Sequence, residues 1–366
     1  MAGRPCPVAQ HHYIKEIRSV KLSCKQFAIA WLLTLLLAVP AHAARTVTDQ
    51  LGRTVSVPDS VSRVVVLQHQ ALDIMIQLGA QGTVVGVLEK WDKYLPGAAK
   101  CMSDIKAMPT PGGLSSVNME ALLALNPDLV IVTHYAPKDM IDQISAAGIP
   151  TVAISLFDAA YAEASKLNPD LKDAQEAYNK GLKDAVLLLG DIFEKQERAA
   201  KLMQTVEQSR SILKSHLGNI PEGERVRCYM ARSNLHTYGR GKYTSVIMER
   251  AGGVNVAAKE VVGFKEVTME DVLRWNPEVI FVQWRHRKAA DQLIADPAWQ
   301  QVDAVKNGQV HVCPEYVKPW GHALPESMAL GELWMAKTLY PEKFKDVDLD
   351  AMVQSYYKEF YGIPFE

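Results

Sequence analysis

The sequence predicts an α/β protein made of two lobes, each built on a parallel sheet, which are joined by a long rigid helix. Three observations predict this class. Short apolar runs alternate with helical patterns in both halves of the chain. Residues 117–132, VNMEALLALNPDLVIV, return in similar form as residues 267–282, VTMEDVLRWNPEVIFV. Between the halves lies a stretch rich in Glu, Lys, Gln, Ala and Leu, which is typical of a helix.

The first 43 residues predict a cleaved export signal. Basic residues precede an apolar run at residues 27–40, and Ala-His-Ala at 41–43 supplies the small residues that a signal peptidase recognises. A membrane anchor is the alternative, but the apolar run is short for a membrane span. The mature chain is therefore expected to begin near Ala44.

The mature composition excludes one class of partner. Subtracting five basic and one acidic residue of the signal leaves 35 Lys and Arg against 40 Asp and Glu, a formal net charge of −5. A nucleic-acid binder would carry a basic excess, so none is expected. Cys101, Cys228 and Cys313 have no metal-type spacing and are expected to be buried thiols rather than to form a bridge. About 320 residues suggest two domains.

The first lobe is expected to span residues 44–177. Its strands alternate with helices, so its sheet should be parallel and covered on both faces. The expected elements are a hairpin (46–58), strands (63–67, 83–88, 128–133, 150–156) and helices (71–79, 118–125, 138–147).

The second lobe, residues 221–366, repeats this order. Its expected elements are strands (225–231, 278–283, 309–314) and helices (244–252, 268–275, 288–296). Residues 178–217, which lack an internal proline, predict one long helix within a connecting region at 178–220. Two such Rossmann-like lobes bind ligands outside the carboxyl ends of their strands, which predicts a cleft between them.

No catalytic motif is present. YGRGKYT at residues 238–244 lacks the earlier glycine of a phosphate-binding loop, and no nucleophile elbow, zinc-protease or dinucleotide motif occurs in a suitable context. Neither an enzyme nor a cofactor is expected. A cleft enzyme and an extracellular adhesion module remain the alternatives from other classes.

The export signal, the TDQLGRTVSVP hairpin and the paired V-x-M-E…N-P segments resemble the periplasmic substrate-binding proteins of ABC importers, of the helical-backbone, ferric-siderophore and cobalamin type. The resemblance implies a periplasmic monomer that meets an ABC permease and its ATPase. VVVLQHQ, GKYTSVIMERAG, PEYVKPWG and ALGELWMAKTLYP resemble the members that bind molybdate or tungstate. A ferric siderophore is the first ligand expected, and molybdate or tungstate is the second.

Glu120 and Glu270 occupy the same place in the two repeated segments. The resemblance implies that these carboxylates dock onto arginines of the permease. A simpler explanation is also open, because a carboxylate in a first helical turn interacts favourably with the helix dipole. Asn118 and Thr268 would then be the N-caps.

Candidate ligand-binding residues follow the predicted strands, where cleft loops should lie. Arginine offers a planar fork of donors that suits anions, and Trp and Tyr offer flat apolar faces. The candidates are His69, Gln70, Trp91, Tyr135, Arg232, Tyr238, Arg240, Trp284, Arg285, Tyr316 and Trp320. His69 and His134 could instead bind a divalent metal ion directly, but the sequence supplies no matching carboxylate that can be placed beside them.

Overall fold

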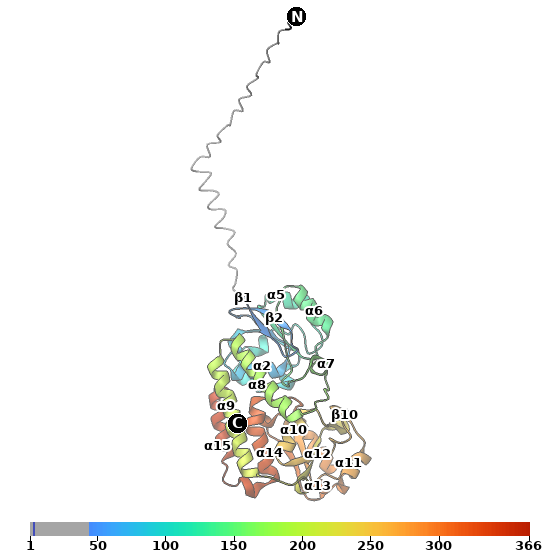
Figure 1. Cartoon of the computed structure of the whole chain (residues 1–366). Coiled ribbons are helices and arrows are strands. Elements are labelled where there is room, and N and C mark those ends of the chain that lie inside the picture. The colour runs from blue at the N-terminus through green and yellow to red at the C-terminus, as the bar shows by residue number, and fades with distance from the viewer. Residues whose placement is uncertain (1–2, 4–43) are drawn as a thin grey trace. The chain divides into compact units, whose positions relative to one another are not determined.

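The computed structural model describes Gly3 and residues 44–366. The predicted export signal lies outside the described residues, apart from Gly3. Residues 44–366 separate from the N-terminal segment as a unit of their own. Within this unit the chain builds an N-terminal lobe, which runs from blue to green in Figure 1, and a C-terminal lobe, which runs to red. No helix among the described residues is long and apolar enough to cross a membrane.

The sheet of the first lobe has four parallel strands in the order β4-β3-β5-β6. Every residue of β3, β5 and β6 is buried, as expected for a sheet covered on both faces. The elements of this lobe are β3 (Val64–Val66), α2 (His69–Gln77), β4 (Val84–Val87), α3 (Trp91–Tyr94), α4 (Ala98–Cys101), α5 (Met119–Ala124), β5 (Leu129–Thr133), α6 (Lys138–Ala146), β6 (Thr151–Ile154) and α7 (Tyr161–Ala164).

The sheet of the second lobe is also four-stranded and parallel, in the order β12-β11-β7-β9. Numbered along the chain within each lobe, both sheets have the strand order 2-1-3-4, so the lobes share one topology. The elements are β7 (Val226–Ala231), α10 (Tyr243–Arg250), β9 (Gly253–Asn255), α11 (Met269–Trp275), β11 (Val279–Gln283), α12 (Arg287–Ala295), α13 (Asp303–Lys306) and β12 (Val310–Cys313).

Two small antiparallel sheets of two strands each accompany the parallel sheets. The predicted hairpin at the start of the mature chain is confirmed as β1 (Ala44–Thr48) and β2 (Thr54–Pro58). A second sheet, which the sequence does not indicate, pairs β8 (His236–Tyr238) with β10 (Phe264–Glu266).

The repeated segment forms the same unit in both lobes, a short helix followed by the third strand of the sheet. Asn126 and Asn276 end the two helices with φ of 43° and 40°. Asparagine tolerates this left-handed conformation, and the proline that follows each one cannot continue a helix. The residues of the repeat are therefore explained by one helix-to-strand turn used twice.

The connecting region corrects one prediction. Residues 178–217 do not form a single helix but belong to α8 (Ala174–Ile192) and α9 (Gln196–Leu217). The chain turns at Glu194, which has a left-handed φ of 56°. The turn brings Gly190 so close to Ala199 that a Cβ on Gly190 would lie 2.5 Å from the Ala199 side chain. Close packing of the two helices therefore outweighs the helix propensity of this segment.

Helix α9 is the element that joins the lobes. Near its start, Arg198 donates a hydrogen bond to the Gln77 carbonyl of the first lobe at 2.7 Å. At its end, Leu217 packs against Gly252 of the second lobe. Helices α14 (Glu332–Leu339) and α15 (Leu349–Phe360) complete the chain, and the Tyr356 hydroxyl donates to Gln77 at 2.6 Å. Both connections cross between the lobes and hold them together.

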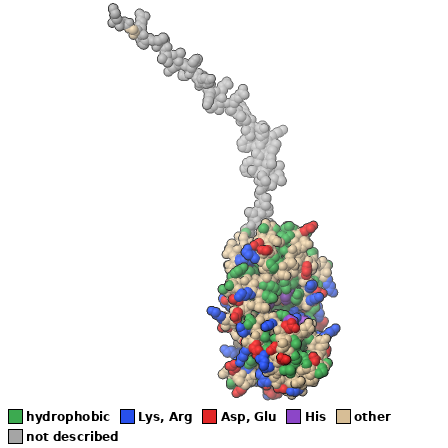
Figure 2. Space-filling view, turned by 90° about the vertical axis from the view of Figure 1, so that its right-hand side faces the viewer, with side chains coloured by type: hydrophobic (Ala, Val, Ile, Leu, Met, Phe, Trp, Pro, Cys, Tyr) green, Lys and Arg blue, Asp and Glu red, His purple; other side chains and the backbone are tan. Residues whose placement is uncertain are grey.

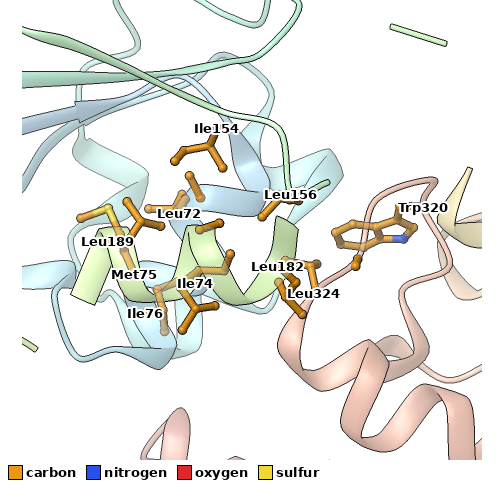
Figure 3. Packing of buried hydrophobic residues seen from close by; sticks show 14 of the residues in the cluster. Leu72, Ile74, Met75, Ile76, Ile154, Leu156, Leu182, Leu189, Trp320 and Leu324 are labelled. Carbon is orange, nitrogen blue, oxygen red and sulfur yellow. The ribbon is translucent and has the colours of Figure 1, made fainter. Parts of the chain in front are cut away.

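The hydrophobic core is continuous between the lobes. Figure 3 shows Leu72 and Met75 of α2 packed near Leu189 of α8, with Leu182 close to Leu324 from the segment after β12. These side chains are fully buried, and burying each such side chain stabilises a fold by roughly 1.5–3 kcal/mol. The three cysteines of residues 44–366 are free thiols, with Cys228 and Cys313 buried and Cys101 partly exposed.

Candidate functional site

The switch points of the two sheets position the site. In both sheets the first and third strands are neighbours, and the chain leaves them in opposite directions. At such a switch point, open α/β sheets bind ligands outside the carboxyl ends of the strands. His69 follows β3 and His134 follows β5 in the first lobe. Arg232 follows β7 and Arg285 follows β11 in the second. The topology therefore explains why polar side chains collect at these ends.

A row of side chains connects the two lobes at this place. The His69 ring stacks on Tyr94 with centroids 4.4 Å apart and meets the Trp320 ring at 5.8 Å. The Arg285 guanidinium lies over the same Trp320 ring, 4.9 Å from its centroid. His69 and Trp320 are each only 6% exposed. Figure 2 shows histidine side chains at the level where the lobes meet.

Arg285 has no carboxylate partner among the described residues. Its Nε donates to Gln283 Oε1 at 2.9 Å, and Gln283 in turn donates to the Pro319 carbonyl at 2.7 Å. Burial lowers the pKa of Arg285, but a guanidinium stays protonated in proteins. Arg285 also lines a surface depression of about 500 Å³ with Trp284. The guanidinium therefore has donors that no carboxylate of residues 44–366 occupies, and such donors suit an anion.

Neutral histidines complete the lining. Burial, together with nearby cations, lowers the pKa of His69 and of His134 to about 3. His322 lies 5.2 Å from His134, ring to ring, and burial lowers its pKa well below the ordinary value. The Nδ1 atoms of His69 and His322 are buried and have no hydrogen-bond partner within residues 44–366. A ligand could supply these partners.

The other predicted residues fall into two groups. Tyr135 packs edge-on against His134, and Tyr238 accepts a hydrogen bond from Arg232 at 3.4 Å, so both belong to the site region. Gln70 is buried in α2. Trp91, at the start of α3, and Trp284, next to Arg285, are half-buried.

Arg240 and Tyr316 lie apart from this cluster. Arg240 is exposed and faces Asp170 at 3.8 Å, and Tyr316 packs on Phe365 with centroids 5.3 Å apart. Both partners lie far away in the sequence, so the sequence does not indicate these contacts. Arg240 and Tyr316 are predicted at the site only because they follow predicted strands.

Three residues of the region are not among the predicted candidates: Lys242, Gln283 and His322. Lys242 belongs to the YGRGKYT stretch, which lacks the earlier glycine of a phosphate-binding loop, and to GKYTSVIMERAG, which resembles the molybdate- or tungstate-binding members, but neither observation marks Lys242 itself. His322 stands two residues after Trp320, and Gln283 ends β11. The only signal that the sequence gives for His322 and Gln283 is that each stands close to a predicted residue.

The direct-metal alternative finds no support in the geometry. The described residues contain no group of three or more His, Cys, Asp or Glu side chains that could hold a metal ion.

Comparisons with known proteins agree with the two-lobed architecture. The model of the periplasmic binding protein family matches residues 64–317. The molybdate-binding protein MolA of Haemophilus influenzae is 48% identical over 346 residues, which cover 94% of this chain and 98% of MolA. The structure of MolA with molybdate bound superimposes with a TM-score of 0.86 over 88% of this chain and 99% of that one.

More distant relatives bind iron complexes. The Fe(3+) dicitrate-binding periplasmic protein FecB of Escherichia coli is 26% identical over 291 residues, covering 77% of this chain and 86% of FecB. A periplasmic solute-binding protein from Veillonella parvula has a TM-score of 0.71 at 20% identity, over 88% of this chain and 94% of its own, and shares the fold.

Proposed function

Because the chain belongs to the periplasmic binding protein family, we propose that it captures a molybdate or tungstate dianion between its lobes and delivers it to an ABC importer. One observation carries the choice of ligand. Arg285 is a partly buried guanidinium that has donors to spare and no carboxylate partner within the described residues. Such a group suits a small oxyanion, because charge-assisted hydrogen bonds to an anion are strong in a partly dry site.

Two observations favour the oxyanion over the ferric siderophore that the sequence places first. The relative at 48% identity binds molybdate, whereas the relatives that bind ferric citrate are 25% and 26% identical. In addition, side chains of the two lobes touch at His69, Trp320, His134 and His322. A bulky chelate would have to separate these rings, while a tetrahedral oxyanion needs far less room.

Thermal unfolding tests the choice of ligand. Sodium molybdate and sodium tungstate are each expected to raise Tm, because a ligand that binds only the folded state adds RT ln(1 + [L]/Kd), about 2.7 kcal/mol at a concentration of 100 Kd. Sodium chloride at matched ionic strength serves as the control. A rise with ferric citrate and none with either oxyanion would contradict the proposal.

The variant Arg285→Met tests the residue on which the proposal depends. Hydrogen bonds to charged groups contribute about 1.5–3 kcal/mol, so molybdate affinity should fall about ten- to hundredfold. The free protein should stay folded, because the change leaves no buried charge unpaired. Arg274→Met is a suitable control, since Arg274 is exposed on α11 and paired with Glu260. Equal molybdate affinity in both variants, measured by calorimetry, would remove Arg285 from the site.

We also propose that Glu120 and Glu270 dock the protein onto the permease. Both are exposed, and neither side chain makes a hydrogen bond or ion pair within residues 44–366. The helix caps do not use them: Asn118 accepts from the Ala121 amide, and Thr268 forms a capping box with Asp271. The caps therefore do not explain a glutamate at either position. Both glutamates stand in a first helical turn, where the helix dipole favours them, and this is compatible with a role toward a partner.

A further inference from the structure

Lys242 is a buried cation that has no counter-ion among residues 44–366. Lys242 is 3% exposed, and the only acceptor that its ammonium meets among the described residues is the Leu167 carbonyl of the first lobe. No carboxylate lies within ion-pair distance of it in residues 44–366. Burial lowers the pKa of Lys242 to about 8. Packing alone would be served better by an apolar side chain, because a buried charge without a partner is costly.

The surroundings of Lys242 belong to the oxyanion site. A Cβ on Gly321 would lie 3.5 Å from Lys242 Cδ and 3.3 Å from the Tyr238 ring. Gly321 stands between Trp320, which carries the Arg285 guanidinium on its face, and His322. The Lys242 charge also contributes to the lowered pKa of His134 and His322. Lys242 and Arg285 therefore approach the same segment, residues 320–322, from the second lobe.

We propose that Lys242 is a ligand-binding residue that makes the site selective for doubly charged oxyanions. This inference rests on the proposed function. An ammonium has three donors, and the Leu167 carbonyl uses one, so two remain for oxyanion oxygens. The neighbouring histidines are neutral and supply no charge of their own. A bound dianion would provide the counter-charge that the fold does not.

The charge of the ligand offers a direct discriminator. Coulomb energy scales with the product of the charges, so loss of one cation costs a dianion about twice as much as a monoanion. Molybdate is a tetrahedral dianion, and perrhenate is a monoanion of the same shape. Removal of Lys242 should therefore weaken molybdate binding by about the square of the factor by which it weakens perrhenate binding.

The test compares Lys242→Met with wild type and with Lys166→Met, using protein purified from the periplasm. Lys166 precedes Leu167 in the segment between α7 and α8, and its side chain is 53% exposed. We expect the molybdate Kd of Lys242→Met to rise tenfold or more, with the Tm of the ligand-free protein unchanged or higher. Lys166→Met should match wild type. Lys242→Gln, which keeps a hydrogen-bond donor, should show the same loss and serves if the Met variant does not fold.

The outcomes separate the two proposals. A molybdate Kd within twofold of wild type in Lys242→Met or Lys242→Gln overturns the role of Lys242 and leaves the proposed function standing. Equal losses for molybdate and perrhenate overturn the charge-selective role. Failure of the wild-type protein to bind molybdate or tungstate overturns the proposed function itself.

Discussion

Reversal of both exposed carboxylates, in the double variant Glu120→Lys and Glu270→Lys, is expected to abolish molybdate uptake by whole cells while leaving molybdate binding intact. The two glutamates occupy equivalent helices, α5 and α11, one on each lobe. If arginines of the permease meet them, reversal places like charges opposite one another at both contacts, and such juxtaposition costs several kcal/mol. Each single variant should retain partial uptake.

Uptake of radioactive molybdate and calorimetry on the purified variant measure the two halves of this prediction. A double variant Glu222→Lys and Glu342→Lys is the matched control, because it changes the net charge equally at two other exposed positions. Normal uptake by the docking variant would refute the role of Glu120 and Glu270. Loss of molybdate binding in that variant would assign them to the ligand site or the fold instead.

The variant Lys318→Met is expected to lower the free energy of unfolding by about 3–5 kcal/mol, the cost of breaking a buried ion pair. Lys318 Nζ lies 2.6 Å from Asp73 Oδ2 and also contacts Glu326 Oε1. The Tyr361 hydroxyl is within hydrogen-bond distance of both carboxylates. Removal of the ammonium leaves two buried carboxylates side by side. Lys201→Met, which breaks an exposed pair with Glu359, should have a much smaller effect.

The pH dependence of this loss gives a second check. Burial raises the pKa of Asp73 well above the ordinary value, and the neighbouring Glu326 raises it further. Without Lys318, Asp73 should take up a proton even more readily in the folded state than in the unfolded chain. Stability then rises as pH falls. Urea unfolding should therefore show a smaller deficit at pH 5.5 than at pH 8, and a deficit that grows on acidification would contradict the ion-pair explanation.

Much of the fold could be predicted because the chain repeats its own pattern. The duplicated segment identifies the third strand of each sheet, and Asn126 and Asn276 take the left-handed turn that the Asn-Pro pairs indicate. The turn at Glu194 could not be predicted in this way. It contains neither glycine nor proline, and it depends on contact between Gly190 and Ala199, which only the folded helices bring together.

Only those site residues that directly follow a strand could be predicted from the sequence. His69 and Arg285 follow strands of the two switch points, so the topology brings them to one place. Trp320 lies beside them because Lys318, two residues earlier, forms ion pairs with Asp73 and Glu326 and so fixes the segment that contains Trp320. Lys242 could not be predicted, because it stands out only as a buried ammonium with no carboxylate beside it in residues 44–366. Burial is a property of the folded chain.

Isothermal titration of the periplasmic protein with sodium molybdate tests the central claim most directly. The account predicts saturable binding of one molybdate per chain, competition by tungstate, and a ten- to hundredfold loss of affinity in Arg285→Met. Absence of binding heat with both oxyanions, together with saturable binding of a ferric chelate, would contradict it.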